Sequence, residues 1–262
     1  MTHYGSFEFE LLPPLVDQLV TFINTLHSAP LIPANLTGID ANAQGVYLLY
    51  HNGTLVYIGK TDAESGLRRR LERHCRNIMH RVGLTPDNVT FKAVRVAVFT
   101  AMDIETALIR RDDLGPHPWN GSGFGANDPG RERDTTKVTP GNFDFDFPID
   151  VDVCLAPMEQ PPPPTAVDVL NHLRNQLPYT FRVERPHNRF HPDLLGANVT
   201  LPRRAATTRH YISAVIGALP PGWQFTRLAG RLILYKESRA YPSAVEIWRS
   251  PGSKGSAHEN LR

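Results

Sequence analysis

The stretch Gly45–His74 reads GVYLLYHNGTLVYIGKTDAESGLRRRLERH. Two short apolar runs, Gly45–Tyr50 and Leu55–Ile58, flank the segment HNGT at 51–54. An Asn-Gly pair between two runs of β-forming residues is the strongest short-range signal for a hairpin. The stretch therefore predicts two antiparallel strands, and the rest of the chain is interpreted around them.

Four side chains of this stretch stand at positions where they can meet. The predicted strands carry Tyr47 and Tyr57, and a polar, glycine-punctuated loop follows them. A basic helix comes next, in which Arg70 and His74 are four residues apart. Residues at this spacing lie on one face of a helix.

This order of motifs resembles the GIY-YIG nuclease superfamily. Gly45–Val46–Tyr47 stands for the GIY triplet, Tyr57–Ile58–Gly59 for the YIG triplet, and Arg70–Leu71–Glu72–Arg73–His74 for the helical motif. Each triplet alone is a weak signal, whereas all of them in this order are a strong one. The resemblance implies an α+β fold whose core is a small three-stranded, mainly antiparallel sheet flanked by helices.

The resemblance also assigns roles in phosphodiester hydrolysis, which needs an activated water and stabilisation of charge on the phosphoryl oxygens. Tyr47 matches the tyrosine proposed as general base, and Tyr57 matches the one that orients water or phosphate. Arg70 matches the arginine that grips the scissile phosphate, where a planar, permanently charged fork suits the geometry. His74 matches the helical histidine that hydrogen-bonds a tyrosine or assists proton transfer.

Three further positions complete the expected site. Glu105 matches the single carboxylate that binds a divalent cation, so the resemblance implies one Mg²⁺ or Mn²⁺ ion per active site. Asn120 matches the late asparagine that tightens the site, and Lys60 adds positive charge after the second motif. Each residue alone has a simpler interpretation: a strand tyrosine packs, an arginine run is a solvated helix face, and a helix-start acid complements the dipole.

A narrower resemblance follows the expected metal ligand. Pro118–Trp119–Asn120, Gly123–Phe124–Gly125, Asp128–Pro129–Gly130 and Arg133 look like a stretch of the type II restriction endonucleases of this superfamily whose type member cuts CCGCGG. The resemblance covers roughly residues 40–145. It implies a homodimer that cuts palindromic double-stranded DNA, with a DNA methyltransferase as a genetic rather than physical partner.

The composition agrees with a globular protein. The chain has 262 residues, of which 41% are hydrophobic and 21% charged, so we expect a packed core. No apolar run is long enough to span a membrane, and the N-terminus lacks the layout of a signal peptide. Cys75 and Cys154 form no CxxC pattern, which indicates neither a disulfide framework nor a zinc module. We expect a cytoplasmic protein.

Elements outside the hairpin follow from periodicity. Apolar residues at helical spacing predict a helix over 13–27, and alternation predicts a strand over 88–99. A helix is expected over 103–111 and a glycine-rich loop over 117–133. Residues 141–153 alternate phenylalanine and aspartate, which predicts an exposed edge strand or arm.

A polyproline stretch predicts the domain boundary. Pro157 and the run 161–164 suggest a spacer, so we expect a nuclease domain over 1–156, a linker over 157–164 and a basic α+β module over 165–250. Residues 251–262 are expected to be a frayed tail. Helices over 166–177 and 207–219, and strands over 179–184, 223–228, 231–236 and 244–249, would build the module.

Charge is distributed unevenly along the chain. Residues 1–164 hold 14 Lys and Arg against 20 Asp and Glu, whereas residues 165–262 hold 14 against 6. The basic part suggests a surface that binds DNA. Its expected phosphate contacts are Arg203, Arg204, Arg209, Arg227 and Arg231. A solvated basic face without a partner is the alternative.

Three functions compete. The favoured hypothesis is a Mg²⁺-dependent, sequence-specific endonuclease of the type II restriction class, which makes double-strand breaks as a dimer. A repair, homing or mobile-element nuclease with a tethered DNA-binding module is the second. A catalytically idle DNA-binding protein is the third, and the presence of all five central residue types argues against it.

Overall fold

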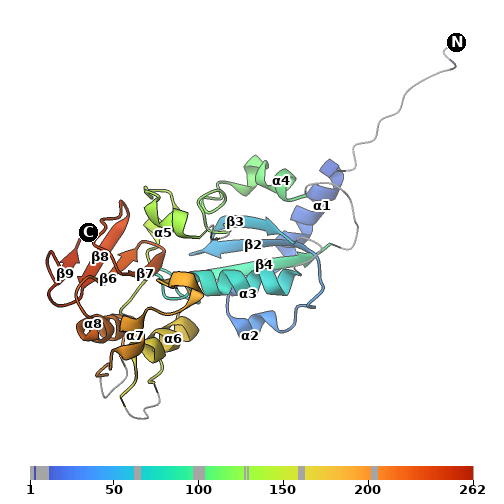
Figure 1. Cartoon of the computed structure of the whole chain (residues 1–262). Coiled ribbons are helices and arrows are strands. Elements are labelled where there is room, and N and C mark those ends of the chain that lie inside the picture. The colour runs from blue at the N-terminus through green and yellow to red at the C-terminus, as the bar shows by residue number, and fades with distance from the viewer. Residues whose placement is uncertain are drawn as a thin grey trace. The chain divides into compact units, whose positions relative to one another are not determined.

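The chain forms two compact α+β units. The computed structural model describes residues 3, 12–61, 66–96, 104–126, 128, 130–158, 163–201 and 206–261. One unit comprises Met1–Ile78 and Thr85–Gly125, and the other comprises Met79–Leu84 and Ala126–Arg262 (Figure 1). In the described part of the chain, no helix is both long and apolar enough to cross a membrane.

The first unit is built on an antiparallel sheet in the strand order β1-β4-β2-β3. Its strands are β1 (Ala29–Pro30), β2 (Gly45–His51), β3 (Thr54–Lys60) and β4 (Val89–Arg95). The hairpin and the third strand are therefore confirmed, and the two-residue β1 adds a fourth strand that the sequence did not predict. β3 is an edge strand, which matters for the site described below.

The turn of the hairpin has the geometry that its sequence predicts. Asn52 and Gly53 adopt φ angles of 50° and 79°, and His51 pairs with Thr54 across the turn. Two consecutive residues with positive φ are what a tight hairpin turn requires, and Asn-Gly tolerates them best.

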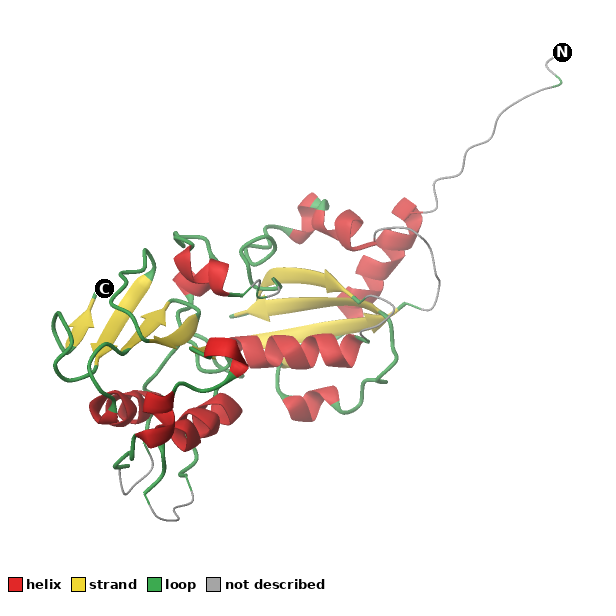
Figure 2. Cartoon of the chain, in the orientation of Figure 1, coloured by secondary structure: helices red, strands yellow, loops and turns green. Residues whose placement is uncertain are grey.

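Helices cover both faces of this sheet (Figure 2). They are α1 (Leu12–Thr25), α2 (Pro33–Leu36), α3 (Leu67–Ile78), α4 (Ile104–Ile109) and a 3₁₀ turn (Asp112–Leu114). Apolar residues of α1 and α4 pack on Val46, Leu48 and Ile58, which share one face of β2 and β3. Strand side chains alternate in direction, so Tyr47 and Tyr57 point to the other face, where α3 lies.

The second unit contains a five-stranded sheet in the order β5-β7-β6-β8-β9. Its strands are β5 (Thr180–Val183), β6 (Gln224–Leu228), β7 (Arg231–Tyr235), β8 (Ala244–Arg249) and β9 (His258–Asn260). Only the β5–β7 pair among these described strands is parallel. The expected strands of this region are confirmed, but the tail is not frayed, because β9 pairs with β8 from Glu246 to Trp248.

Short helices accompany this sheet. They are α5 (Phe143–Asp146), α6 (Ala166–Gln176), α7 (Pro192–Gly196), α8 (Thr208–Ala218) and the 3₁₀ turns Arg131–Thr135 and Pro186–Asn188. α6 and α8 begin with capping boxes at Thr165 and Thr207, which satisfy backbone N–H groups of the first turn. Both helices pack on the face of the sheet that carries Phe181, Phe225 and Trp248.

The expected exposed edge strand or arm over 141–153 is wrong, because part of the stretch is helical and Phe143, Ile149 and Val151 are buried. Residues Phe143–Asp146 form a helix, with the Asn142 side chain accepting a hydrogen bond from the Asp144 N–H at 3.0 Å. The rings of Phe143 and Phe147 lie 5.4 Å apart, one helical turn from each other. Phenylalanine and aspartate alternate over residues 143–147 alone, which is too short a run to distinguish strand from helix once a capping residue precedes it.

The expected boundary at the polyproline stretch is also displaced. Ile149, Val151 and Leu155 are buried in the core that α6 and α8 share with the second sheet. The Arg209 N–H donates to the Val151 carbonyl at 2.9 Å, and the Leu155 N–H donates to the Ala206 carbonyl at 2.9 Å. Residues 126–156 therefore belong to the second unit, whereas the notion of a spacer rested on proline content alone.

Candidate active site

A buried cluster of aromatic rings lies between the hairpin and α3. The Tyr47 hydroxyl and His74 Nε2 are hydrogen-bonded at 2.8 Å, and each residue is only 1% exposed. The Tyr57 ring lies 6.1 Å from the Tyr47 ring and 5.3 Å from the His74 ring. Tyr47, Tyr57 and His74, which the sequence motifs singled out, therefore lie together in the structure.

The strand register explains this meeting. Tyr47 on β2 stands opposite Gly59 on β3, and Leu49 stands opposite Tyr57, so both tyrosines lie diagonally on one face of the hairpin. The Tyr47 ring fills the space that a side chain on Gly59 would take. A Cβ atom at Gly59 would come within 2.4 Å of the Tyr47 ring and hydroxyl, so only glycine fits there.

Burial keeps the central pair neutral. It strongly raises the pKa of Tyr47 above the usual value for a phenol, and the neighbouring Tyr57 adds to this. Burial also lowers the pKa of His74 to about 3, with the charges of Arg73 and Arg70 as further causes. At neutral pH the site therefore holds a phenol and an imidazole rather than two ions.

The unsatisfied nitrogen of His74 fixes its tautomer. Nδ1 is buried and has no hydrogen-bond partner among the described residues. A buried N–H without an acceptor is rarer than an unused lone pair, so we place the proton on Nε2. In that form His74 donates to the Tyr47 oxygen, a bond that strengthens when the oxygen is negatively charged.

Two charged residues act on both tyrosines. The Glu105 carboxylate raises the pKa of Tyr47 and of Tyr57, and the Arg70 guanidinium lowers both. Arg70 lies one turn before His74 on α3, whereas Glu105 comes from the first turn of α4. Tyr47, Tyr57, Arg70, His74 and Glu105 thus share one electrostatic neighbourhood.

Asn120 is fixed to the strand that carries Tyr57. Its side-chain oxygen accepts from the Ile58 N–H at 2.9 Å, and its nitrogen donates to the Ile58 carbonyl at 2.8 Å. The preceding Trp119 N–H donates to the Val56 carbonyl at 2.9 Å. Asn120 therefore supplies the backbone partners that an edge strand lacks, and it holds β3 in place without touching the reacting groups directly.

Lys60 directly follows the second motif and is the last residue of β3. It is exposed at the end of β3 and alternates with Gly59, so it points to the face opposite the two tyrosine rings. A role near the phosphate stays a prediction for Lys60.

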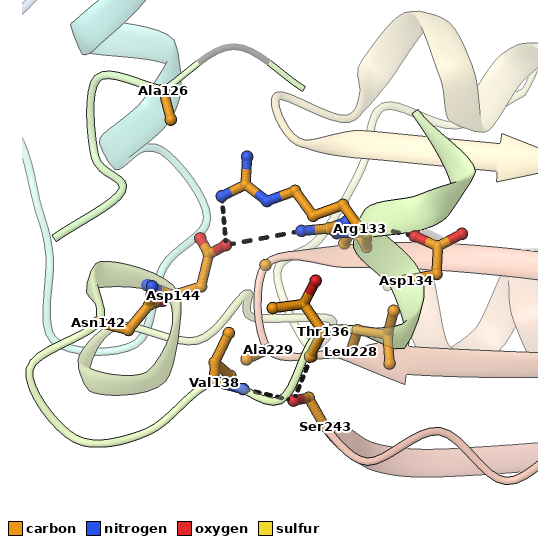
Figure 3. A pocket seen from close by; sticks show the side chains of 12 residues that line it. Ala126, Arg133, Asp134, Thr136, Val138, Asn142, Asp144, Leu228, Ala229 and Ser243 are labelled. Carbon is orange, nitrogen blue, oxygen red and sulfur yellow. Dashed lines mark hydrogen bonds and ion pairs between the residues drawn. The ribbon is translucent and has the colours of Figure 1, made fainter. Parts of the chain in front are cut away.

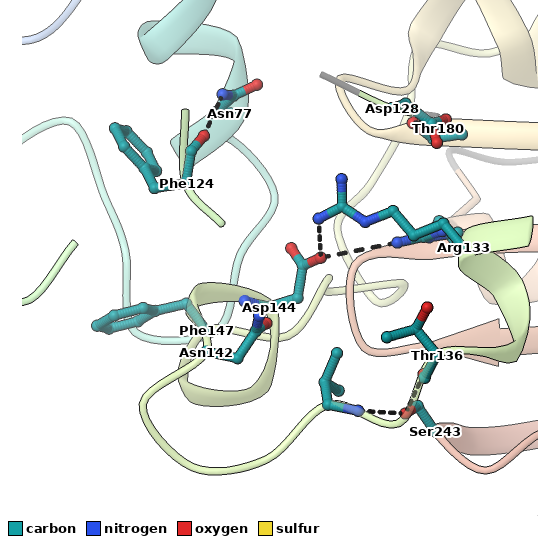
Figure 4. Close-up of polar contacts among 12 residues, drawn as sticks. Asn77, Phe124, Asp128, Arg133, Thr136, Asn142, Asp144, Phe147, Thr180 and Ser243 are labelled. Atoms are coloured by element: carbon teal, nitrogen blue, oxygen red, sulfur yellow. Dashed lines mark hydrogen bonds and ion pairs between the residues drawn. The ribbon is translucent and has the colours of Figure 1, made fainter. Parts of the chain in front are cut away.

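One wall of the cluster was not predicted as functional. The Phe124 ring stacks on the His74 ring with centroids 4.7 Å apart, and it meets the Tyr57 ring edge-on at 5.2 Å. The carbonyl of Phe124 accepts from the Asn77 side chain at 3.2 Å (Figure 4), and that of Gly125 accepts from Arg73. Arg73 and Asn77 follow Arg70 and His74 by three residues, a spacing that places all four on one helix face.

The arginine run of α3 therefore divides into two sets. Arg69 and Arg76 are exposed, and Arg68 pairs with Glu72 at 3.0 Å, as a solvated helix face would. Arg70 and Arg73 are half-buried and turn toward the rings. The simple interpretation of the run holds for its outer members alone.

The donor set near the tyrosines fits one hydrated cation. No cluster of three or more histidine, cysteine, aspartate or glutamate residues with metal-ligand geometry occurs in the described ranges. Mg²⁺ does not require such a cage, because it keeps several waters and binds through one or two carboxylates together with substrate phosphates. Glu105, half-buried beside two phenols, is the carboxylate that meets this need.

A separate hollow of about 330 Å³ lies within the second unit (Figure 3). Arg133, Asp134, Asp144 and Arg231 line it, and these charges pair with one another. The buried Asp134 accepts hydrogen bonds from Arg231 at 3.2 Å and from the Tyr235 hydroxyl at 3.0 Å. The lining is therefore a satisfied ion-pair network rather than a set of groups awaiting a ligand.

The arginines expected to contact DNA are largely engaged elsewhere. Arg231 is 6% exposed and bonded to Asp134, and Arg227 pairs with Glu246 at 3.1 Å. Arg209 pairs with both Asp152 and Glu246. This arrangement counts against an exposed cluster formed by these three, and Arg203 and Arg204 lie outside the described residues.

No family model matches the sequence, and no curated protein matches it.

Proposed function

We propose that this chain is a divalent-metal-dependent DNA endonuclease of the GIY-YIG type. The observation that carries the proposal is the buried Tyr47–His74 hydrogen bond with Tyr57 beside it and Arg70 and Glu105 acting on both phenols. The sequence places the same residues at the positions that the superfamily uses for hydrolysis. Packing of the core does not require an arginine that lowers and a glutamate that raises the pKa of the same two tyrosines.

The roles follow from the contacts. Tyr47 acts as a base only as phenolate: its hydroxyl proton is first released to solvent, and the His74 Nε2–H stabilises the phenolate oxygen. The phenolate then takes the proton from the attacking water and returns to the neutral phenol. Tyr57, the more exposed phenol, orients the water or a phosphoryl oxygen. Arg70 favours the phenolate and pairs with the phosphate, while Asn120 and Phe124 hold the hairpin and His74 in position.

Glu105 would hold the metal. A Mg²⁺ or Mn²⁺ ion bound there supplies positive charge for the phosphoryl and leaving oxygens. In this structure the Glu105 carboxylate raises the pKa of the two phenols, after the larger effect of burial, and a bound cation would offset that contribution.

The narrower proposal is a type II restriction endonuclease that cuts double-stranded DNA as a homodimer. It rests on the motif at 118–133, whose Phe124–Gly125 part forms the wall against His74. The homing-enzyme alternative relied on a DNA-binding module tethered by a spacer. It loses that support, because residues 126–262 belong to one compact unit that includes the expected spacer.

The proposal is tested by Glu105→Gln. This change removes the expected metal ligand while preserving size, so cleavage of supercoiled plasmid with Mg²⁺ should fall by at least about 10³-fold. Binding of a labelled duplex without metal should stay within about twofold of wild type, because Glu105 is not proposed to contact DNA. Glu72→Gln, a carboxylate on α3 paired with Arg68, is the matched control and should cleave normally. Cleavage by the Glu105 variant at the wild-type rate would remove Glu105 from the site.

A further inference from the structure

A groove of about 480 Å³ runs along the free edge of the second sheet. β5 is the edge strand there, and it contributes residues from Phe181 to Val183. Four arginines from three segments of the chain line the same groove. They are Arg131, Arg174, Arg182 and Arg185.

Two of these arginines are neutralised. Arg182 pairs with Asp128 and with the buried Asp134. Arg131 bonds to Glu237 at 3.3 Å and lies over the Tyr235 ring at 4.1 Å. These two therefore add little net charge to the groove.

The other two carry unbalanced charge. Neither Arg174 nor Arg185 forms an ion pair within the described residues, and both side chains are exposed. Both line the same groove, and the pKa of Arg174 is lowered first by burial and then by the charge of Arg185. Glu184, the acid next in sequence, also lines the groove, and its carboxylate accepts from the Lys236 N–H at 2.6 Å, so one negative charge stands against these two arginines.

The local backbone holds Arg185 in place. Its guanidinium lies over the Phe190 ring at 4.2 Å. Between them, His187 and Asn188 adopt φ angles of 50° and 64°, a left-handed pair that is rare outside glycine. A left-handed turn that holds Arg185 in the same groove as Arg174 is not explained by the stability of the fold.

We propose that this groove binds the phosphodiester backbone of DNA, with Arg174 and Arg185 as its phosphate contacts. The inference rests on the proposed nuclease function for the choice of DNA as the polyanion. Guanidinium groups suit this ligand because they stay charged and present paired donors to phosphate oxygens. The groove also replaces the contacts expected at Arg209, Arg227 and Arg231, which are satisfied within the protein.

The test uses the full-length protein and the double variant Arg174→Gln/Arg185→Gln. Binding of a fluorescent duplex is measured by anisotropy without metal across a series of salt concentrations. Losing two phosphate contacts should flatten the plot of log K against log salt by about two units and weaken binding about tenfold or more. The control is Arg239→Gln/Lys254→Gln, which removes the same charge from exposed positions of the same unit outside the groove. The control should keep the wild-type slope.

Other outcomes would overturn the inference. Equal slopes for the groove variant and wild type would show that the groove does not touch DNA. If duplex binding is unchanged but the ³¹P line broadening of inorganic phosphate is lost, the groove is a free-phosphate site. Unchanged binding with new self-association in light scattering would mean that the arginines only protect an edge strand from pairing.

The nuclease proposal fails separately. Wild-type protein that binds duplex through the groove but never nicks plasmid with Mg²⁺ would overturn the nuclease and leave the binding surface. Wild-type protein that cuts plasmid, with a groove variant of unchanged salt slope, would overturn only the binding surface.

Discussion

His74 is a histidine that the fold prevents from becoming charged. Its ring is packed against Tyr47 and Phe124, and two arginines approach it from its own helix. A protonated imidazole there would be a buried cation facing like charge. His74 thus acts as a neutral hydrogen-bond donor over the whole range in which an ordinary histidine titrates.

This neutrality predicts how stability depends on pH. The pKa of His74 is about 3 in the folded protein and about 6.5 in the unfolded chain, so the unfolded state binds a proton first as pH falls. Stability contributed by the neutral ring is complete above pH 6.5 and is lost toward pH 3. By pH 5 the loss should be about 2 kcal/mol. Hydrogen exchange of the β2 and β3 amides, corrected for intrinsic rates, measures it.

A substitution isolates the contribution of His74. His74→Gln should remove about 2 kcal/mol of the change between pH 7.5 and 5, because glutamine does not titrate. His80→Gln is the matched control. Burial lowers the pKa of His80 as well, but His80 belongs to the other unit and lies outside the hairpin. If wild type and His74→Gln lose protection equally, His74 is not held neutral.

At the scale of elements, the hairpin contains an edge strand, β3, which is hydrogen-bonded by residues of a loop as well as by β2. β3 pairs with β2 on one side, and Trp119 and Asn120 supply donors and acceptors on the other. An edge strand without such partners is prone to slip or to pair with another chain. The loop that closes over His74 therefore also fixes the register that places Tyr57 beside Tyr47.

Gly59 is where this register is most sensitive. Gly59→Ala would push a methyl group to within 2.4 Å of the Tyr47 ring, so the ring or the strand must move. We expect a loss of about 1–3 kcal/mol in the free energy of unfolding of the first unit. Gly38→Ala is the control, because a Cβ there meets nothing within 4 Å and should leave stability unchanged or slightly higher. Equal unfolding midpoints in urea for both variants would contradict this account.

Elements that depend on local sequence were predicted correctly, whereas elements that depend on partners distant in the sequence were missed. The turn at Asn52–Gly53 depends on its own φ angles, so sequence alone suffices for it. β9 exists only because it pairs with β8, a partner that its polar sequence does not indicate. Within the site, the motifs predicted Tyr47 and His74. They did not predict that Phe124, fifty residues after His74, stacks on its ring. The position of Phe124 depends on hydrogen bonds from Arg73 and Asn77 to the carbonyls of its loop.

The charge distribution over the whole molecule also could not be predicted from a segment of the sequence alone. Residues 165–262 are strongly basic as a segment, but the second unit also includes the acidic stretch 126–156. The unit holds 18 Lys and Arg against 14 Asp and Glu, a far milder excess. Asp134 and Asp144 of that stretch neutralise Arg182 and Arg231, so part of the basic charge of the segment is paired within the unit.

The division of the chain predicts which fragment is well behaved. A fragment that ends at Pro157, where proline content suggested a linker, would carry Ile149, Val151 and Leu155 without the core that buries them. Three exposed aliphatic side chains represent several kcal/mol of lost burial, and we expect this fragment to aggregate. A fragment that ends at Gly125 omits them and keeps the whole first sheet, so it should stay monomeric with β2 and β3 protected from exchange. Size-exclusion chromatography with light scattering compares the two. A monomeric, exchange-protected fragment 1–157 alongside an aggregated fragment 1–125 would show that residues 126–157 belong with the hairpin after all.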